Sequence, residues 1–221
     1  LFRSGLWHGD GMTYGVLLAH GSPDPRSAQW VACAAASVSD RAGFPVVGAF
    51  LDHDTPRLDE AVAAAAAHDE VVVLPLLLSA AFHARVDVPA AASALPRAVT
   101  LLDPLGHPPA VLDAALLRAG ARCVVVAAGT KVDDERAAFG DAVEASSERT
   151  GMPASVAFAT GPGARLTDSA PGTVVVPWLL APGRLLDSVL ASAAESSYAV
   201  VGGPLLDEAT MLDAIAARLH R

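Results

Sequence analysis

The chain has 221 residues, a formal net charge of −9 at pH 7 and 52% hydrophobic residues. This composition excludes an intrinsically disordered chain. The acidic balance argues against a nucleic-acid-binding protein and against binding to an anionic membrane surface. The longest apolar stretch, 71–82, contains Pro75 and Ser79 and is shorter than the roughly 20 apolar residues that span a bilayer. We therefore expect a globular cytoplasmic protein with no membrane or nucleic-acid partner.

Residues 1–11 lack an initiator Met and any hydrophobic periodicity, so we expect an extension or remnant that precedes the fold at Met12. From there, short β-branched segments alternate with alanine-rich segments. The pattern predicts strands at 14–19, 46–51, 71–78, 99–102, 123–128, 155–159, 173–180 and 198–201. It predicts helices at about 27–42, 57–68, 86–95, 109–119, 133–150, 184–196 and 206–220, with Gly43, Gly120 and Gly151 at helix C-termini.

An internal repeat divides this alternating pattern into two parts. The matched segments are 16–22 with 124–130, 43–50 with 151–158, 72–78 with 174–180, and 104–118 with 204–218. We predict an α/β fold of two tandem similar lobes, each a four-stranded, mainly parallel sheet flanked by helices. The expected lobes are 12–120, which carries the metal site, and 121–221, a degenerate repeat. They should pack across a cleft.

Polar side chains follow the strands of the first half. His20 comes after the first strand, Asp52 after the second, and His83 after the third. Ligands of open parallel sheets bind at the carboxyl ends of the strands, so we expect these side chains to share one edge. The repeat places Ala128, Thr160 and Leu185 at the equivalent positions. The polar set therefore occurs once per chain, which favours a functional site over a packing role.

Two imidazoles and a carboxylate suit a divalent transition metal. Neutral imidazole also serves as a general base near neutral pH. His20, Asp52 and His83 are therefore candidates for metal ligands, and the two histidines also for general bases. The chain has no GxxxxGK[ST] phosphate-binding loop and no GxSxG elbow, so we expect no nucleotide cofactor and no serine hydrolase.

Four segments resemble the sirohydrochlorin chelatase family of the CbiX/SirB type, the class II chelatases. They are LLAHGSPDPR (17–26), AFLDHDTP (49–56), LPLLLSAAFHARVDVP (74–89) and PLGHPP (104–109). The resemblance implies a tetrapyrrole cleft between two α/β lobes. It also implies ATP-independent insertion of Fe²⁺ or Co²⁺ into sirohydrochlorin, in sirohaem or cobalamin biosynthesis. Ni²⁺ would suit the same ligands.

Residue by residue, His20 and His83 match the metal-binding and catalytic histidines of that family. Asp52 stands where the family usually has Glu. The carboxylates of a tetrapyrrole need hydrogen-bond donors. The nearest candidates are the backbone of Gly21 and Ser22 and the side chains of Arg26 and Arg85.

Two other functions compete with this interpretation. The altered acidic position, Asp52, raises the alternative of a non-catalytic metal or tetrapyrrole carrier with the same fold. A histidine phosphatase also carries His-Gly after a strand, but it places Arg directly before the His, where this chain has Ala19. Because one chain carries both lobes, a monomer can form a complete cleft.

Overall fold

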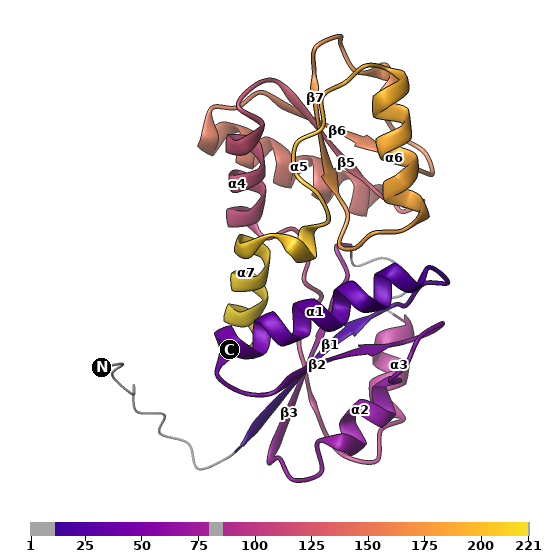
Figure 1. Cartoon of the computed structure of the whole chain (residues 1–221), viewed down its shortest axis with the longest axis vertical. Helices are drawn as coiled ribbons and strands as arrows, with labels where there is room; N and C mark the ends of the chain where they lie inside the picture. Colours follow the sequence, from indigo (N-terminus) through magenta and orange to yellow (C-terminus); the bar gives the residue numbers. More distant parts are fainter. Residues whose placement is uncertain (1–11, 80–85, 221) are drawn as a thin grey trace, which may run out of the picture.

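The computed structural model describes residues 12–79 and 86–220. Two parallel sheets lie one above the other along the long axis of the molecule (Figure 1). The first has the order β2-β1-β3-β4 and the second the order β6-β5-β7. The strands are β1 (Thr13–Ala19), β2 (Val46–Phe50), β3 (Glu70–Pro75), β4 (Thr100–Leu101), β5 (Cys123–Ala127), β6 (Ala154–Phe158) and β7 (Val174–Trp178). The observed fold thus confirms the predicted α/β class with parallel sheets flanked by helices.

Helices cover both faces of each sheet. They are α1 (Pro25–Ala42), α2 (Leu58–Ala64), α3 (Val88–Ser93), α4 (Pro109–Ala119), α5 (Asp133–Thr150), α6 (Arg184–Glu195) and α7 (Ala209–Leu219). Alternate strand residues serve the two faces. In β1, Leu17 belongs to the core under α1, whereas Val16 and Leu18 belong to the core under α2 and α3. The predicted glycines Gly43, Gly120 and Gly151 end α1, α4 and α5 in left-handed conformations.

The prediction of a fourth strand in the second sheet is wrong. Segment 198–201 makes only one isolated bridge, between Val175 and Val200. The N–H of Val175 donates to Ala199 O over 2.8 Å, and the N–H of Val201 donates to Val175 O over 2.9 Å. The ladder stops there because two glycines and Pro204 follow, and proline has no N–H to donate.

The register of the two sheets repeats along the sequence. Gly15 pairs with Val46 in the first sheet, and the residues 108 positions later, Cys123 and Ala154, pair in the second. At the third strand of each sheet, Pro75 and Pro177 take the same place opposite equivalent central-strand residues. The sequence repeat therefore corresponds to equivalent backbone positions.

The last helix of each half packs on the other half's sheet. α4 contacts α5 and β7, and α7 contacts α1 and β3. In Figure 1, α4 lies in the upper lobe and α7 beside α1 in the lower. We define the first lobe as the β1–β4 sheet with α1, α2, α3 and α7, and the second as the β5–β7 sheet with α4, α5 and α6. The predicted division into 12–120 and 121–221 describes the sequence repeat and stays a prediction. The lobes in space differ from it, because α4 and α7 each pack with the other half.

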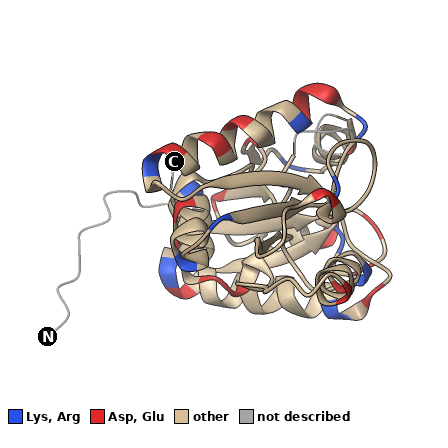
Figure 2. Cartoon of the chain, turned by 90° about the horizontal axis from the view of Figure 1, so that it is seen from above, with Lys and Arg blue, Asp and Glu red and all other residues tan. Residues whose placement is uncertain are grey.

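One hydrophobic core joins the two lobes. It contains Leu74 of β3 and Trp178 of β7, together with Leu116 of α4 and Ile215 of α7. Charged residues gather on the peripheral helices and loops, while the strands are largely uncharged (Figure 2). Within residues 12–79 and 86–220, no helix combines the length and apolar character needed to cross a membrane.

Candidate active site

A cavity of about 390 Å³ lies between the lobes, at the carboxyl ends of β1 and β7. We call it the interlobe cleft. The first lobe contributes the loop after β1 and the start of α1, and the second contributes the loop after β7 and the start of α6. The cleft therefore stands where ligands of open parallel sheets bind. Its lining residues are Ala19, His20, Gly21, Ser22, Pro23, Asp24, Ser27, Val31, Leu76, Leu77, Leu179, Leu180, Ala181, Pro182, Gly183, Arg184, Leu185, Leu186 and Leu206.

The loop that carries His20 is fixed by contacts to the loop after β2. The N–H of Asp52 donates to His20 O over 2.8 Å. Gly21 has φ +96°, and a Cβ there would lie 1.7 Å from Asp52 O, so only glycine fits. The N–H of Ser22 donates to Asp54 Oδ2 over 3.0 Å. That N–H is therefore engaged within the loop, and its role is to hold His20 in the cleft wall.

The second lobe has the same loop without the histidine. The N–H of Thr160 donates to Ala128 O over 2.9 Å. Gly129 has φ +99°, and a Cβ there would lie 2.1 Å from Thr160 O. Ala128 thus takes the place of His20, and Thr160 takes that of Asp52. Because the repeated loop keeps its backbone without these polar groups, the fold itself does not require them.

Asp52 lies near a second histidine. Its side chain is 61% exposed and Oδ1 accepts the backbone N–H of His53 over 2.8 Å. This hydrogen bond and the neighbouring charges of His53 and Arg57 hold the pKa of Asp52 below its usual range. His53 has φ +64°, and its ring centroid lies 6.3 Å from that of His20. His53 was not among the site residues predicted from the sequence, because nothing in the sequence indicates that its ring lies near that of His20.

His83 and Arg85, the remaining predicted site residues of the third-strand loop, lie outside the described residues. Among residues 12–79 and 86–220, no three His, Cys, Asp or Glu side chains form a metal-binding cluster. The described part of the site thus brings His20 and His53 near each other, with Asp52 beside His53. A ligand set that includes His83 stays a prediction.

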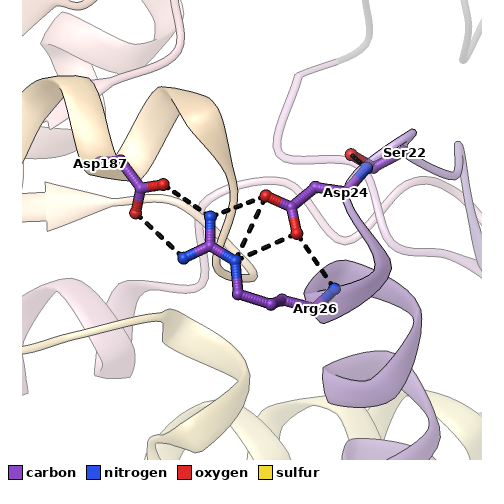
Figure 3. A network of polar contacts seen from close by, with 4 residues as sticks. All are labelled: Ser22, Asp24, Arg26 and Asp187. Atoms are coloured by element: carbon purple, nitrogen blue, oxygen red, sulfur yellow. Dashed lines mark hydrogen bonds and ion pairs between the residues drawn. The ribbon is translucent and has the colours of Figure 1, made fainter.

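Arg26 lies between two carboxylates (Figure 3). Its Nη2 is 2.7 Å from Asp24 Oδ2 and 2.6 Å from Asp187 Oδ2. Hydrogen bonds from Arg26 also keep the pKa of Asp24 low. The ion pair joins the start of α1 to the first turn of α6, so it links the lobes at the cleft. The cleft wall itself contains a different cation, Arg184. Sequence reasoning missed it because it considered only strand ends of the first half.

A second cavity, of about 260 Å³, lies beside the cleft and shares four leucines with it. His107 lines this cavity, and its Nδ1 accepts a hydrogen bond from Trp178 Nε1–H over 3.0 Å. Burial lowers the pKa of His107 from 6.5 to about 4. The imidazole is therefore neutral at physiological pH, and Nε2 carries its proton.

The half-buried His107 should make the protein less stable in mild acid. As the pH falls from about 6.5 towards about 4, the unfolded chain binds a proton at His107 that the folded protein does not. The free energy of unfolding should therefore fall over this window, by a few kcal/mol at most, and not above it. Urea unfolding of the wild type and His107→Gln across this pH range measures the effect. An equally steep fall in the variant would contradict it.

Comparisons with known proteins identify a family and a fold. The CbiX family model matches residues 15–121. This segment belongs to the CbiX family. The family predicted from the sequence is therefore confirmed, and the CbiX segment contains His20, Asp52 and the first-lobe wall of the cleft. No curated protein sequence matches the chain.

Solved structures share the fold over nearly the whole chain. SirB from Bacillus subtilis, solved with Fe³⁺, has a TM-score of 0.78 at 19% identity, covering 95% of this chain and 94% of SirB. CbiX, described as the terminal enzyme of sirohaem biosynthesis in denitrifying bacteria, has a TM-score of 0.67 at 20% identity, with 94% and 98% covered. A multi-domain Deinococcus radiodurans protein with structural similarity to chelatases has a TM-score of 0.72 at 19% identity, with 95% and 55% covered. The chelatase fold thus extends beyond the CbiX segment to the second lobe.

Proposed function

We propose that this protein inserts a divalent metal, Fe²⁺ or Co²⁺, into sirohydrochlorin without ATP, in sirohaem or cobalamin biosynthesis. The observation that carries the proposal is the position of His20. It directly follows β1 in the CbiX segment and lines a cleft between two lobes of the chelatase fold. The CbiX family and the chelatase fold support metal insertion into a tetrapyrrole as the reaction class.

A hydrogen bond to the backbone fixes a tautomer of His20 that suits a metal ligand. Nδ1 lies 3.3 Å from Gly21 O. A carbonyl oxygen only accepts, so Nδ1 carries the proton in this hydrogen bond and the lone pair is on Nε2. A backbone carbonyl that fixes the tautomer in this way is a common partner of metal-binding histidines. In the proposed reaction, His20, Asp52 and His83 bind the metal substrate, and His53 lies near His20 and Asp52.

The cleft also suits the organic substrate. Metal insertion requires the inner pyrrole nitrogens to lose their protons, and neutral imidazoles accept protons near neutral pH. Apolar side chains, Val31 and Leu76 from the first lobe and Leu179 from the second, line the cleft and can contact the faces of a planar ring. Gly21 and Ser22 shape the loop that presents His20. Because both walls come from one chain, we propose that a monomer is sufficient.

A non-catalytic metal or tetrapyrrole carrier is the second candidate. It is favoured by Asp52, which is one methylene shorter than the usual Glu and accepts a hydrogen bond from its neighbour His53. A carboxylate held in this way reaches less far into the cleft. A carrier would keep the cleft and the fold but would not complete the transfer of the metal.

Anaerobic absorbance measurements distinguish the two functions. The protein at catalytic concentration is mixed with excess sirohydrochlorin and with Fe²⁺, Co²⁺ or Ni²⁺ in turn. We expect many turnovers of metallated product per protein, at a rate above that of the protein-free mixture. A carrier would instead shift the spectrum only up to one macrocycle per chain. That result, or no effect at all, would overturn the proposed reaction.

A further inference from the structure

We propose that Arg184 binds a carboxylate of the tetrapyrrole, and that Arg26 is a positioning residue that keeps Arg184 available for this contact. The inference rests on the proposed function and names a specificity-determining contact for it. It replaces the expectation that Arg26 itself binds the substrate. The inference depends on four charged side chains that lie close together at the cleft. They are Asp24, Arg26, Asp187 and Arg184.

Arg184 is the first residue of α6 and lines the interlobe cleft on the second-lobe side. Among the described lining residues it is the sole side chain with a permanent positive charge. In the described part of the chain, 12–79 and 86–220, Arg184 makes no ion pair and no side-chain hydrogen bond. Its guanidinium is also exposed. A basic side chain in a cleft wall with no carboxylate partner is available to an anionic ligand.

The absence of a partner is notable because Asp187 lies three residues further along the same helix. Oppositely charged side chains at that spacing are neighbours on a helix surface and normally pair. Here both carboxylate oxygens of Asp187 accept from Arg26, Oδ1 from Nη1 over 3.2 Å and Oδ2 from Nη2 over 2.6 Å. Arg26 therefore holds Asp187 away from Arg184.

Arg26 also binds Asp24, the acidic side chain that lines the cleft. Asp24 accepts from Arg26 Nε over 3.0 Å and from Nη2 over 2.7 Å. The pKa of Asp24 is lowered chiefly by the Arg26 side chain and to a smaller degree by the charge of Arg184. Asp24 and Arg184 line the same cleft, and in the described part of the chain no hydrogen bond or ion pair joins them. One guanidinium thus binds both carboxylates and leaves the second guanidinium facing the cleft.

The chemistry of the proposed substrate matches this arrangement. Sirohydrochlorin carries carboxylates around its rim, and the protein's net charge of −9 repels such a ligand at long range. A local arginine offsets that repulsion and can bind a carboxylate through two parallel N–H bonds. Arg184 lies on the wall opposite the lobe that carries His20, so a carboxylate bound there would hold the rim of a ring that extends towards His20.

The first test measures binding directly with uroporphyrin, a planar tetrapyrrole with carboxylates around its rim, by fluorescence titration. We expect Arg184→Ala to raise Kd by about tenfold, the loss of one charge-assisted contact. Arg122→Ala removes the same charge at the opposite, amino-terminal end of β5 and should leave Kd unchanged. A tetrapyridinium porphyrin, planar but cationic, should bind Arg184→Ala no more weakly than the wild type. Equal uroporphyrin affinity in wild type and Arg184→Ala would overturn the inference.

The second test separates positioning from simple structural loss. Arg26→Ala releases Asp187 to pair with Arg184 and should raise Kd for uroporphyrin by about threefold or more. In the triple variant Arg26→Ala/Asp24→Asn/Asp187→Asn, neither carboxylate that Arg26 binds in the wild type can pair with Arg184, so the affinity should recover. A purely structural role for Arg26 predicts no recovery, and that outcome would overturn its assignment.

Steady-state kinetics distinguish failure of this inference from failure of the proposed function. In the metal insertion assay, Arg184→Ala and Arg26→Ala should raise KM for sirohydrochlorin while kcat changes little. Wild-type turnover with an unchanged KM in Arg184→Ala overturns the inference alone. A wild-type protein that neither binds uroporphyrin nor inserts metal overturns both.

Discussion

Replacing His20 by Ala should lower the rate of metal insertion by about 10²- to 10⁴-fold, the range expected for loss of a group that binds the reacting metal or accepts its protons. His20 lines the interlobe cleft at the end of β1, and Ala128 stands at the same position of the repeated loop. The second lobe shows that this backbone accommodates Ala, so the fold should tolerate the substitution. Anaerobic assays with Fe²⁺ and Co²⁺ measure the rate, and thermal unfolding checks the fold.

A matched control for this experiment is His220→Ala. It removes an exposed imidazole at the end of α7, on the first lobe but not in the cleft. We expect it to leave the rate unchanged. His83→Ala should lower the rate to a similar extent as His20→Ala if both side chains bind the metal. Wild-type rates in His20→Ala with either metal would remove His20 from the site.

Replacing Leu116 by Ala should lower the free energy of unfolding by about 2–5 kcal/mol, the range for truncating a fully buried leucine. Leu116 is 0% exposed in the core that joins the two lobes. Its neighbour on α4, Leu117, is 58% exposed. Leu117→Ala is therefore a matched control with the same chemical change, and should cost less than about 0.5 kcal/mol. Urea unfolding followed by circular dichroism measures both variants.

Because this core is shared, Leu116→Ala should weaken both lobes together. Trp30 on α1 belongs to the first lobe and Trp178 on β7 to the second. Single-tryptophan versions should therefore report one common transition, which moves to lower urea in Leu116→Ala. Separate transitions for the two tryptophans, with only that of Trp178 shifted, would show that the lobes unfold independently.

Much of the fold could be predicted from local pattern. The β-branched segments placed β1 and β5 within one residue of their observed bounds, and Gly43, Gly120 and Gly151 gave the ends of three helices. Segment 198–201 shows where the pattern is insufficient. Its residues suit a strand, but strand length depends on hydrogen-bonding partners, and the chain leaves β7 after one bridge. The packing of α4 and α7 on opposite halves depends on tertiary contacts, which periodicity does not encode.

The sequence could predict those site residues that follow directly after a strand, but not contacts between residues far apart in the chain. The repeat singled out His20, and the structure places it in the cleft. The role of Arg26 could not be inferred because its partner Asp187 is 161 residues away. Because Arg26 pairs with this distant carboxylate, its guanidinium is engaged in an ion pair and is not available to a ligand. Arg184 became a candidate only when the fold placed α6 opposite β1.

The helices α4 and α7, each packed on the sheet of the other half, have a consequence for ligand entry. Many two-lobed proteins close on ligands by rotating about a hinge, which requires an interface that can separate. Here such a rotation would pull apart a close-packed interior that continues from one sheet to the other. The gap that receives the ligand should therefore keep nearly the same width whether empty or filled. Discrimination among flat macrocycles would then rest on preset dimensions and on side-chain rotamers, not on domain closure.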